Sequence, residues 1–164
     1  MNQKLLKLAQ EIRIEIAQIE NSIERSSLGW QRYLDSSDQL YLDSVALGLH
    51  NFYSGLERLF EKVAKVVDGT LPSGANWHQL LLEQMSLESP QLRPALISVE
   101  SRKALEEYRG LRHVVRNVYA FQLDPDKLRF LVEAAPLVFS KIKTECLSFA
   151  SFVEHQAQIE IPRS

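Results

Sequence analysis

Three arginines and one histidine recur at helical spacing within one short segment of the chain. They are Arg109, Arg112, His113 and Arg116. At about 100° per residue, these four side chains fall within an arc of about 100° on one face of a helix. Arginine makes planar, bidentate contacts to phosphate, and histidine can move a proton near neutral pH. The spacing therefore predicts a phosphate-binding face on which His113 takes part in proton transfer.

An ordinary solvated helix surface is the alternative interpretation of this face. Two features of the sequence argue against it. The segment 109–121 contains no acidic residue and no lysine, whereas the polar sides of the other predicted helices mix Glu with Lys and Arg. Clustered guanidiniums also repel each other unless negative charge faces them. We therefore expect an anion or an acidic surface opposite these arginines.

Five helices are predicted to position this face, because apolar residues recur at spacings of three and four along the chain. Gly69 favours the end of the second helix, since glycine adopts the left-handed conformation without strain. Pro136 is expected to kink the fifth helix, because its ring clashes with the carbonyl four residues before it. The predicted helices cover approximately residues 2–25 or beyond, 38–68, 77–85, 98–121 and 125–154.

Residues with capping side chains precede several of these helices. Polar side chains of the segment 35–37 are predicted to cap the second helix, and Asn76 is predicted to cap the third. Asp124 is expected to cap the fifth helix, with Pro125 in its first turn, where the missing N–H costs nothing. Long helices with short connections predict an all-α, up-and-down bundle.

Composition limits the classes of protein to which the chain can belong. Its 164 residues are 45% apolar, which suits a single helical domain spanning residues 1–164. A net charge of -2 gives no overall attraction to nucleic acid, so any basic site must be local. The single cysteine, Cys146, and the lack of a long apolar run predict a cytoplasmic protein with no membrane segment.

Histidine spacing gives little support for a metal site. No two histidines lie four residues apart, and none has a glutamate three residues before it. No metal or cofactor is therefore predicted. Glu57 on the second helix is a candidate partner for an arginine of the fourth helix. His78 is expected to serve local packing or helix capping.

The arginine-rich segment resembles the signature of the HEPN superfamily, most closely that of the HepT-like toxins. Their motif reads arginine, a polar residue, three further residues, histidine, one residue and tyrosine. In this chain Arg112 takes the arginine position and His113 the polar position. Asn117 takes the histidine position, and Tyr119 the tyrosine position. Segments 49–58 and 76–78 are also similar to a HepT-like branch.

This resemblance implies a function as well as a HEPN-like fold. It implies the toxin of a HEPN/MNT toxin–antitoxin system, a helical homodimer that acts as a metal-independent endoribonuclease on an RNA substrate. The implied partner is an MNT-type nucleotidyltransferase antitoxin, which neutralises the toxin by attaching AMP to Tyr119.

The resemblance also implies roles for the residues of the arginine-rich face. Arg112, His113 and Asn117 would be catalytic, while Arg109 and Arg116 would bind RNA phosphates. Arg112 and Arg116 together would hold the scissile phosphate and stabilise the charge that builds on it. Asn117 would position the phosphate or the ribose.

Asn117 departs from the family pattern, because asparagine cannot exchange a proton as histidine does. One outcome is that His113 takes over proton transfer. Another is a catalytically silent module that docks a nucleotidyltransferase or a nucleotide. A third, unrelated function is a helical scaffold whose arginine face meets an acidic protein surface.

Overall fold

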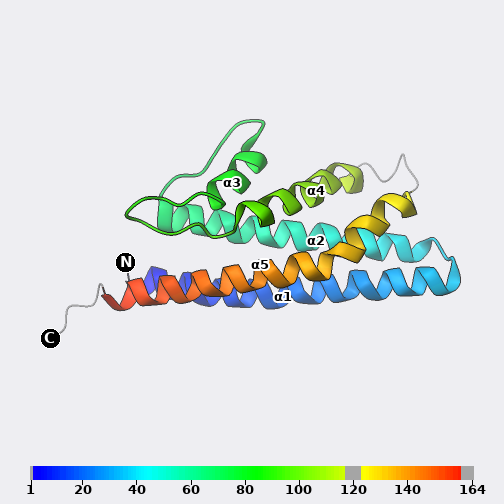
Figure 1. Cartoon of the computed structure of the whole chain (residues 1–164), viewed down its shortest axis with the longest axis horizontal. Coiled ribbons are helices and arrows are strands. Elements are labelled where there is room, and N and C mark those ends of the chain that lie inside the picture. Colours follow the sequence, from blue (N-terminus) through cyan, green and yellow to red (C-terminus); the bar gives the residue numbers. More distant parts are fainter. Residues whose placement is uncertain (1, 117–122, 160–164) are drawn as a thin grey trace.

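The computed structural model describes residues 2–116 and 123–159, which fold into helices without any strand. A π-helical segment, η1 (Ala64–Asp68), continues the second helix. Figure 1 shows the helices arranged as a bundle, so the all-α fold predicted from the sequence is confirmed. The α-helices are α1 (Asn2–Ser36), α2 (Leu40–Val63), α3 (Trp77–Met85), α4 (Val99–Arg116) and α5 (Pro125–Ile159).

The α1–α2 hairpin is tightly packed because small residues line its seam. A Cβ atom added at Gly48 would lie 2.0 Å from Ser26 Oγ and 2.8 Å from the Ser22 carbonyl oxygen. Ser26 is fully buried, and its hydroxyl donates a 3.0 Å hydrogen bond to the Val45 carbonyl. Glycine at this position therefore lets the two helices approach closely, and α2 becomes a fixed platform for the elements above it.

The first helix is longer than its minimum predicted length. It continues to Ser36 because Trp30 and Tyr33 extend the buried stripe, with their rings 5.4 Å apart. The predicted cap of the second helix at residues 35–37 is wrong. Residues 35 and 36 belong to the end of α1, and the Asp38 carboxylate accepts a 3.0 Å hydrogen bond from the Leu40 N–H instead.

The other predicted boundaries agree better with the structure. Gly69, with φ of 70°, follows η1 and ends the second helical stretch. The Asp124 carboxylate accepts a 3.0 Å hydrogen bond from the Asp126 N–H, which confirms the cap of α5. Asn76 occupies the N-cap position of α3, but its side chain makes no capping hydrogen bond, so that prediction holds only for the position.

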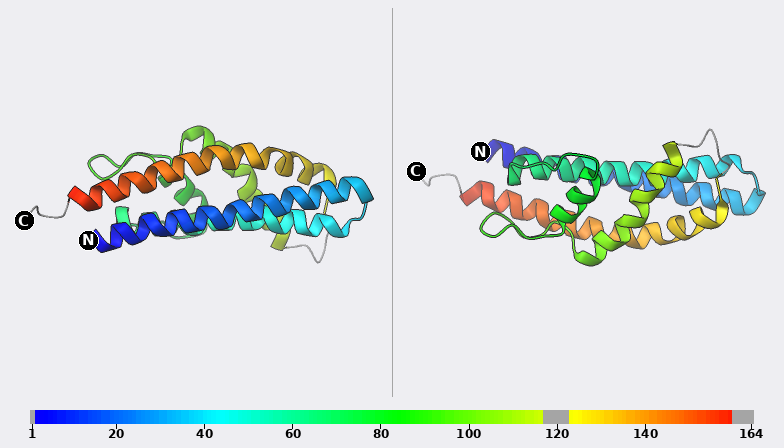
Figure 2. Two further views of the ribbon diagram at one scale, coloured as in Figure 1. Left: turned by 90° about the horizontal axis from the view of Figure 1, so that it is seen from below. Right: turned by 90° about the horizontal axis from the view of Figure 1, so that it is seen from above.

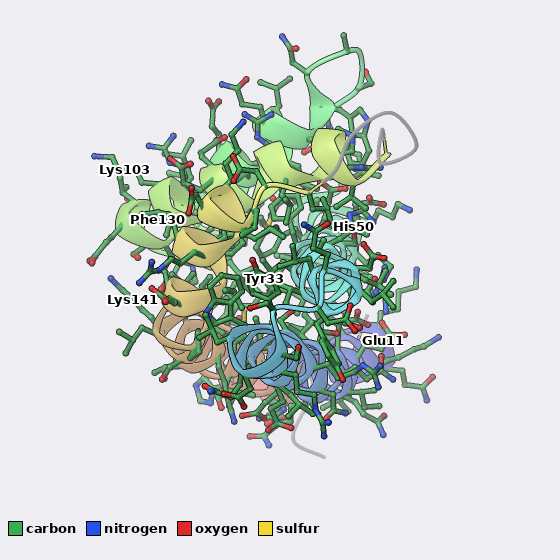
Figure 3. All side chains as sticks on the ribbon, turned by 90° about the vertical axis from the view of Figure 1, so that its right-hand side faces the viewer. Glu11, Tyr33, His50, Lys103, Phe130 and Lys141 are labelled. Atoms are coloured by element: carbon green, nitrogen blue, oxygen red, sulfur yellow. The ribbon has the colours of Figure 1, made fainter. Side chains whose placement is uncertain are left out.

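Helices α1 and α5 lie side by side along most of their length (Figure 2). Pro136 lies inside α5, and Figure 1 shows the helix changing direction between its gold first part and its orange remainder. An end-on view in Figure 3 shows Tyr33 near the middle of the bundle. In the same view Lys103, Phe130 and Lys141 point away from it.

Helix α4 runs obliquely over α2 and α5 and is anchored at two points (Figure 2). At its start, the Glu145 carboxylate of α5 accepts a 2.6 Å hydrogen bond from the Ser98 N–H. In its middle, the Tyr108 hydroxyl donates a 2.7 Å hydrogen bond to the Leu131 carbonyl. Leu111, further along, is buried in the core. These contacts fix the rotation of α4 and therefore the direction of Arg109 and Arg112.

Within residues 2–116 and 123–159, no helix combines the length and apolarity needed to cross a membrane. The same residues contain no group of three or more His, Cys, Asp and Glu side chains that could hold a metal ion. Cys146 is fully buried on α5, where burial raises the pKa of its thiol.

Candidate functional site

A buried carboxylate faces the arginines of α4 from helix α2. Glu57 is only 6% exposed, and its Oε1 accepts a 3.0 Å hydrogen bond from Arg112 Nη1. The predicted pairing of Glu57 with an arginine of the fourth helix is thus confirmed. A buried charge needs such a partner, because removing it from water is otherwise strongly unfavourable.

His78 of α3 joins this ion pair. Its Nδ1 lies 2.7 Å from the second oxygen of Glu57, and because a carboxylate only accepts, Nδ1 carries the proton. Arg112 Nη1 lies 2.9 and 3.1 Å from the two ring nitrogens. These near-equal distances place the guanidinium over the ring face. The local packing expected of His78 is confirmed by its ring contact with Trp77, but the residue also joins the Glu57–Arg112 pair.

Tyr53 completes the surroundings of Glu57. Burial raises the pKa of the Tyr53 phenol, and the neighbouring Glu57 carboxylate, which accepts its hydrogen bond, raises it further. The phenol therefore keeps its proton at neutral pH. Donors from Arg112, His78 and Tyr53 converge on one buried carboxylate. We call these four residues the Glu57 cluster.

Arg109 has a different carboxylate partner. Its Nε lies 2.8 Å, and its Nη2 2.6 Å, from Oε2 of Glu106, which precedes it by three residues on α4. Both described arginines of the predicted face are therefore paired, and they are half-buried rather than fully exposed. The negative charge expected opposite the arginines is supplied, for these two, by the chain itself.

Arg112 nevertheless keeps donor capacity beyond its contacts with Glu57 and His78. Its Nε is buried and has no hydrogen-bond partner among the residues that the structure describes. The side chain is 23% exposed. Buried N–H groups are almost always paired, so Arg112 is bonded less completely than a purely structural arginine would be.

Several predicted site residues lie outside what the structure describes. His113 and Arg116 belong to α4, but their side chains are not described. Asn117 and Tyr119 lie outside the described residues altogether. Of the six predicted residues, the structure therefore brings Arg112 into a polar cluster and places Arg109 one turn before it.

The remaining described histidines lie apart from this cluster. His155 is exposed on α5, in the last turns of the bundle. His50 is half-buried on α2 (Figure 3), and its Nε2 lies 3.5 Å from the Ser54 hydroxyl one turn later.

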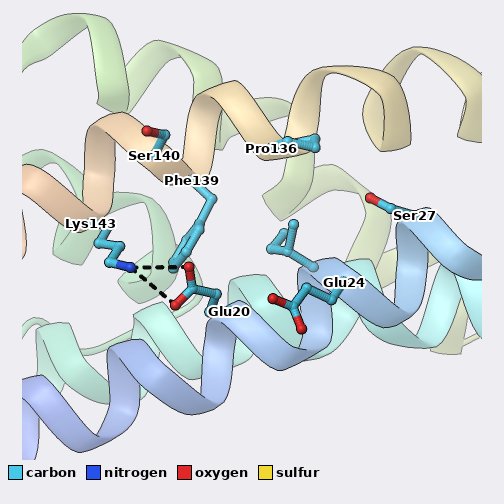
Figure 4. A pocket seen from close by; sticks show the side chains of 8 residues that line it. Glu20, Glu24, Ser27, Pro136, Phe139, Ser140 and Lys143 are labelled. Atoms are coloured by element: carbon cyan, nitrogen blue, oxygen red, sulfur yellow. Dashed lines mark hydrogen bonds and ion pairs between the residues drawn. The ribbon is translucent and has the colours of Figure 1, made fainter.

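A concave surface lies between α1 and α5 (Figure 4). This pocket has a volume of about 420 Å³ and an apolar floor that includes Phe139. At one end Lys143 Nζ lies 3.0 and 3.1 Å from the two carboxylate oxygens of Glu20. Its lysine is thus already neutralised, and no histidine lines the pocket. The Glu57 cluster is the stronger candidate for chemistry.

Comparison with known proteins places this cluster in a family context. A family model described as HepT-like protein matches residues 44–153. The matched range covers most of the chain and contains all four residues of the Glu57 cluster. No curated protein and no solved structure matches the chain at a significant level.

Proposed function

This chain belongs to the HepT-like protein family, and from that premise we propose that it is the toxin of a toxin–antitoxin pair and cleaves RNA without a metal ion. The observation that carries the proposal is the state of Arg112, which occupies the arginine position of the family motif. Glu57 and His78 hold one end of its guanidinium, while Nε is left without a partner among the described residues. The side chain is 23% exposed, and the planar donors of a guanidinium suit a phosphate group.

The proposed reaction is attack of a ribose 2′-hydroxyl on the adjacent phosphate. The oxygen–phosphorus bond forms, the bond from phosphorus to the 5′-oxygen breaks, and a cyclic phosphate and a 5′-hydroxyl result. Arg112 and Arg116 hold the phosphate and stabilise its growing charge, and Arg109 binds a neighbouring phosphate. His113 transfers a proton, and Asn117 positions the substrate. A homodimer would double this site.

The proposed regulator is an MNT-type nucleotidyltransferase antitoxin that transfers AMP to Tyr119. The phenolic oxygen attacks the α-phosphate of ATP, the new oxygen–phosphorus bond replaces the bond to pyrophosphate, and the phenolic proton passes to solvent. The added phosphate would compete with RNA for the arginines of α4. Intact-mass analysis after co-expression with such an enzyme should show one or more AMP additions, and Tyr119→Phe should abolish them.

RNA cleavage in the presence of a chelator tests the proposed activity. We expect the purified protein to cut a fluorophore-labelled single-stranded RNA, and we expect His113→Ala to abolish cleavage. His155→Ala, an exposed position on α5, is the matched control and should keep full activity. Undiminished cleavage by His113→Ala would remove His113 from the mechanism. Failure of the wild-type protein to cut any RNA would contradict the proposed function.

A catalytically silent binding module is the second candidate function. Asn117 at the histidine position favours it, and so does Glu106, which already occupies the guanidinium of Arg109. Such a module would form a tight complex with a nucleotidyltransferase or bind a nucleotide, and no variant would cut RNA. The chelator assay and a binding measurement on the same preparation separate the two candidates.

A further inference from the structure

RNA cleavage by a 2′-hydroxyl needs one group that removes a proton and another that delivers one. The motif position that usually supplies a histidine is Asn117 in this chain. His113 of α4 can fill only one of the two roles at a time. A search of the described residues for a second proton carrier near Arg112 leads to His78 of α3.

His78 has the arrangement that acid–base histidines require. Its Nδ1 donates a 2.7 Å hydrogen bond to the buried carboxylate of Glu57. A neutral imidazole that carries its proton on Nδ1 presents a free lone pair on Nε2. A buried carboxylate behind an imidazole holds the ring in this tautomer and stabilises the cation that forms when Nε2 takes a proton.

The ring of His78 is also fixed in orientation. The Trp77 indole stacks on it with ring centroids 3.6 Å apart, and Arg112 Nη1 lies against the other face. Glu57 occupies the Nδ1 edge. The side chain is 24% exposed. The edge of the ring that carries Nε2 is opposite the edge bound by Glu57, and Arg112 Nη1 lies 3.1 Å from this nitrogen.

The distance between His78 and Arg112 brings this edge next to the expected phosphate. Arg112 Nη1 lies 3.1 Å from His78 Nε2. A phosphate bound by the remaining donors of Arg112 would therefore lie beside Nε2, within reach of the neighbouring ribose hydroxyl.

We propose that His78 is the general base of the RNA cleavage, with Glu57 as its positioning residue. The inference rests on the proposed function. Nε2 removes the proton from the 2′-hydroxyl while that oxygen bonds to phosphorus. As the bond to the 5′-oxygen breaks, His113 delivers a proton to the leaving oxygen. Arg112 holds the phosphate.

Other ionisable groups surround the pair and must be considered in a pH profile. Tyr53 of α2 faces Glu57, and Arg109 and Glu106 of α4 act on Tyr53. Burial raises the pKa of Tyr53, so its phenol stays neutral between about pH 5 and 9. The arginines stay charged throughout that range. We therefore expect neither Tyr53 nor the arginines to shape the pH profile in that range.

The first test compares His78→Gln with His155→Gln on an oligonucleotide containing a single ribonucleotide, in the presence of a chelator. We expect His78→Gln to lower kcat by about 10²- to 10⁴-fold with little change in KM, and to flatten the acid limb of the pH profile. His155→Gln should match the wild type. An unchanged thermal melting curve of His78→Gln by circular dichroism would exclude unfolding of the variant. Undiminished cleavage by His78→Gln with an unchanged pH profile would overturn the assignment.

Two further measurements separate a general base from a structural histidine. Imidazole added to His78→Ala should restore part of the cleavage rate, whereas the wild type should not respond. A substrate with sulfur in place of the 5′-oxygen needs no proton on its leaving group, so the His78→Gln defect should persist on it. Disappearance of the defect on this substrate, or no rescue by imidazole, would contradict the base role.

Glu57→Gln tests the positioning role. The amide keeps the size of the side chain and removes its charge, so we expect a lower kcat and a shifted acid limb with nearly constant KM. An unchanged pH profile would contradict the role of Glu57. If the wild-type protein cuts no RNA, the proposed function itself fails and the base role with it. If the wild type cuts RNA and His78→Gln cuts it equally well, only the role of His78 as general base is excluded.

Discussion

Two arginine–carboxylate pairs in this molecule have the same composition but differ in how many nitrogens of the guanidinium have hydrogen-bond partners. Arg93 has an almost fully buried side chain, with Nε 2.6 Å and Nη2 2.9 Å from the carboxylate of Asp68. Its Nη1 donates 3.0 Å hydrogen bonds to the carbonyls of Leu87 and Pro94, and Nη2 reaches the Gln84 carbonyl at 3.1 Å. All three nitrogens of this guanidinium have partners.

Arg112 is paired with Glu57, but in the part of the chain that the structure describes not every nitrogen of its guanidinium has a hydrogen-bond partner. Its side chain is 23% exposed, against 2% for Arg93, and its Nε has no partner among the described residues. Arg93 binds backbone carbonyls of the connection between α3 and α4 and so holds that connection in place. A guanidinium whose nitrogens all have partners serves the fold, whereas the 23% exposed side chain of Arg112 is still accessible to a ligand.

The largest expected effect is on stability, at Arg93. We expect Arg93→Ala to lower the free energy of unfolding by about 3–5 kcal/mol. The Asp68 carboxylate would stay buried without its charged partner, and several backbone carbonyls would lose their hydrogen-bond donor. Urea denaturation followed by circular dichroism measures this change. A loss below 1 kcal/mol would show that the Arg93 contacts do not hold the fold.

The matched substitution at Arg112 should have a smaller effect. We expect Arg112→Ala to cost about 1–2 kcal/mol, because Glu57 keeps the hydrogen bonds from His78 and Tyr53 and the arginine is partly solvated. The same denaturation measurement applies. A loss as large as that of Arg93→Ala would make Arg112 a structural arginine and would erase the contrast between the two pairs.

Helical periodicity and local chemistry were enough to predict most of the fold. The end of the second helix at Gly69 and the cap at Asp124 are set by short-range backbone effects, which local sequence contains. The pairing of Glu57 with the fourth helix could also be predicted from the sequence. The predicted cap at residues 35–37 is wrong because Trp30 and Tyr33 pack against the core, and α1 therefore continues past Gly29.

The role of His78 could not be read from the sequence. It depends on where α3 lies and how it is rotated, and Arg93, Asp68 and Gln84 set this through contacts between distant segments. The partner of Arg109 can be predicted from the sequence, since Glu106 precedes it by three residues on the same helix.

A third prediction asks whether the Glu57 cluster is held locally or by the anchor at the start of α4. Glu145→Ala removes the carboxylate that accepts the Ser98 N–H, and we expect a loss of about 1 kcal/mol, as for a helix cap. RNA cleavage per folded molecule should stay at the wild-type level. A large loss of cleavage without unfolding would show that the anchor at Glu145, not Glu57, positions Arg112.

The smallest effect concerns acid stability. Burial alone would raise the pKa of Asp68, but hydrogen bonds from Arg93 and Gln84 and the charge on Arg93 hold it below the ordinary value of 3.8. A carboxylate with a lowered folded-state pKa stabilises the fold at neutral pH, and this contribution is lost as pH falls through that pKa.

We therefore expect the stability difference between the wild type and Asp68→Asn to shrink below about pH 4. Urea denaturation at neutral pH and at successively lower pH measures that difference. A difference that stays constant with pH would show that Asp68 does not titrate with folding and would weaken its assignment as a charged partner of Arg93.

Exchanging arginine for lysine at the two sites tests the central claim most directly. Both variants keep a positive charge, but lysine cannot reproduce the planar contacts of a guanidinium. In a chelator-containing RNA cleavage assay, corrected for the folded fraction, we expect Arg112→Lys to lose about 10²- to 10³-fold in kcat and to stay folded. Arg93→Lys should be less stable yet keep its activity per folded molecule. Full cleavage by folded Arg112→Lys would contradict the account.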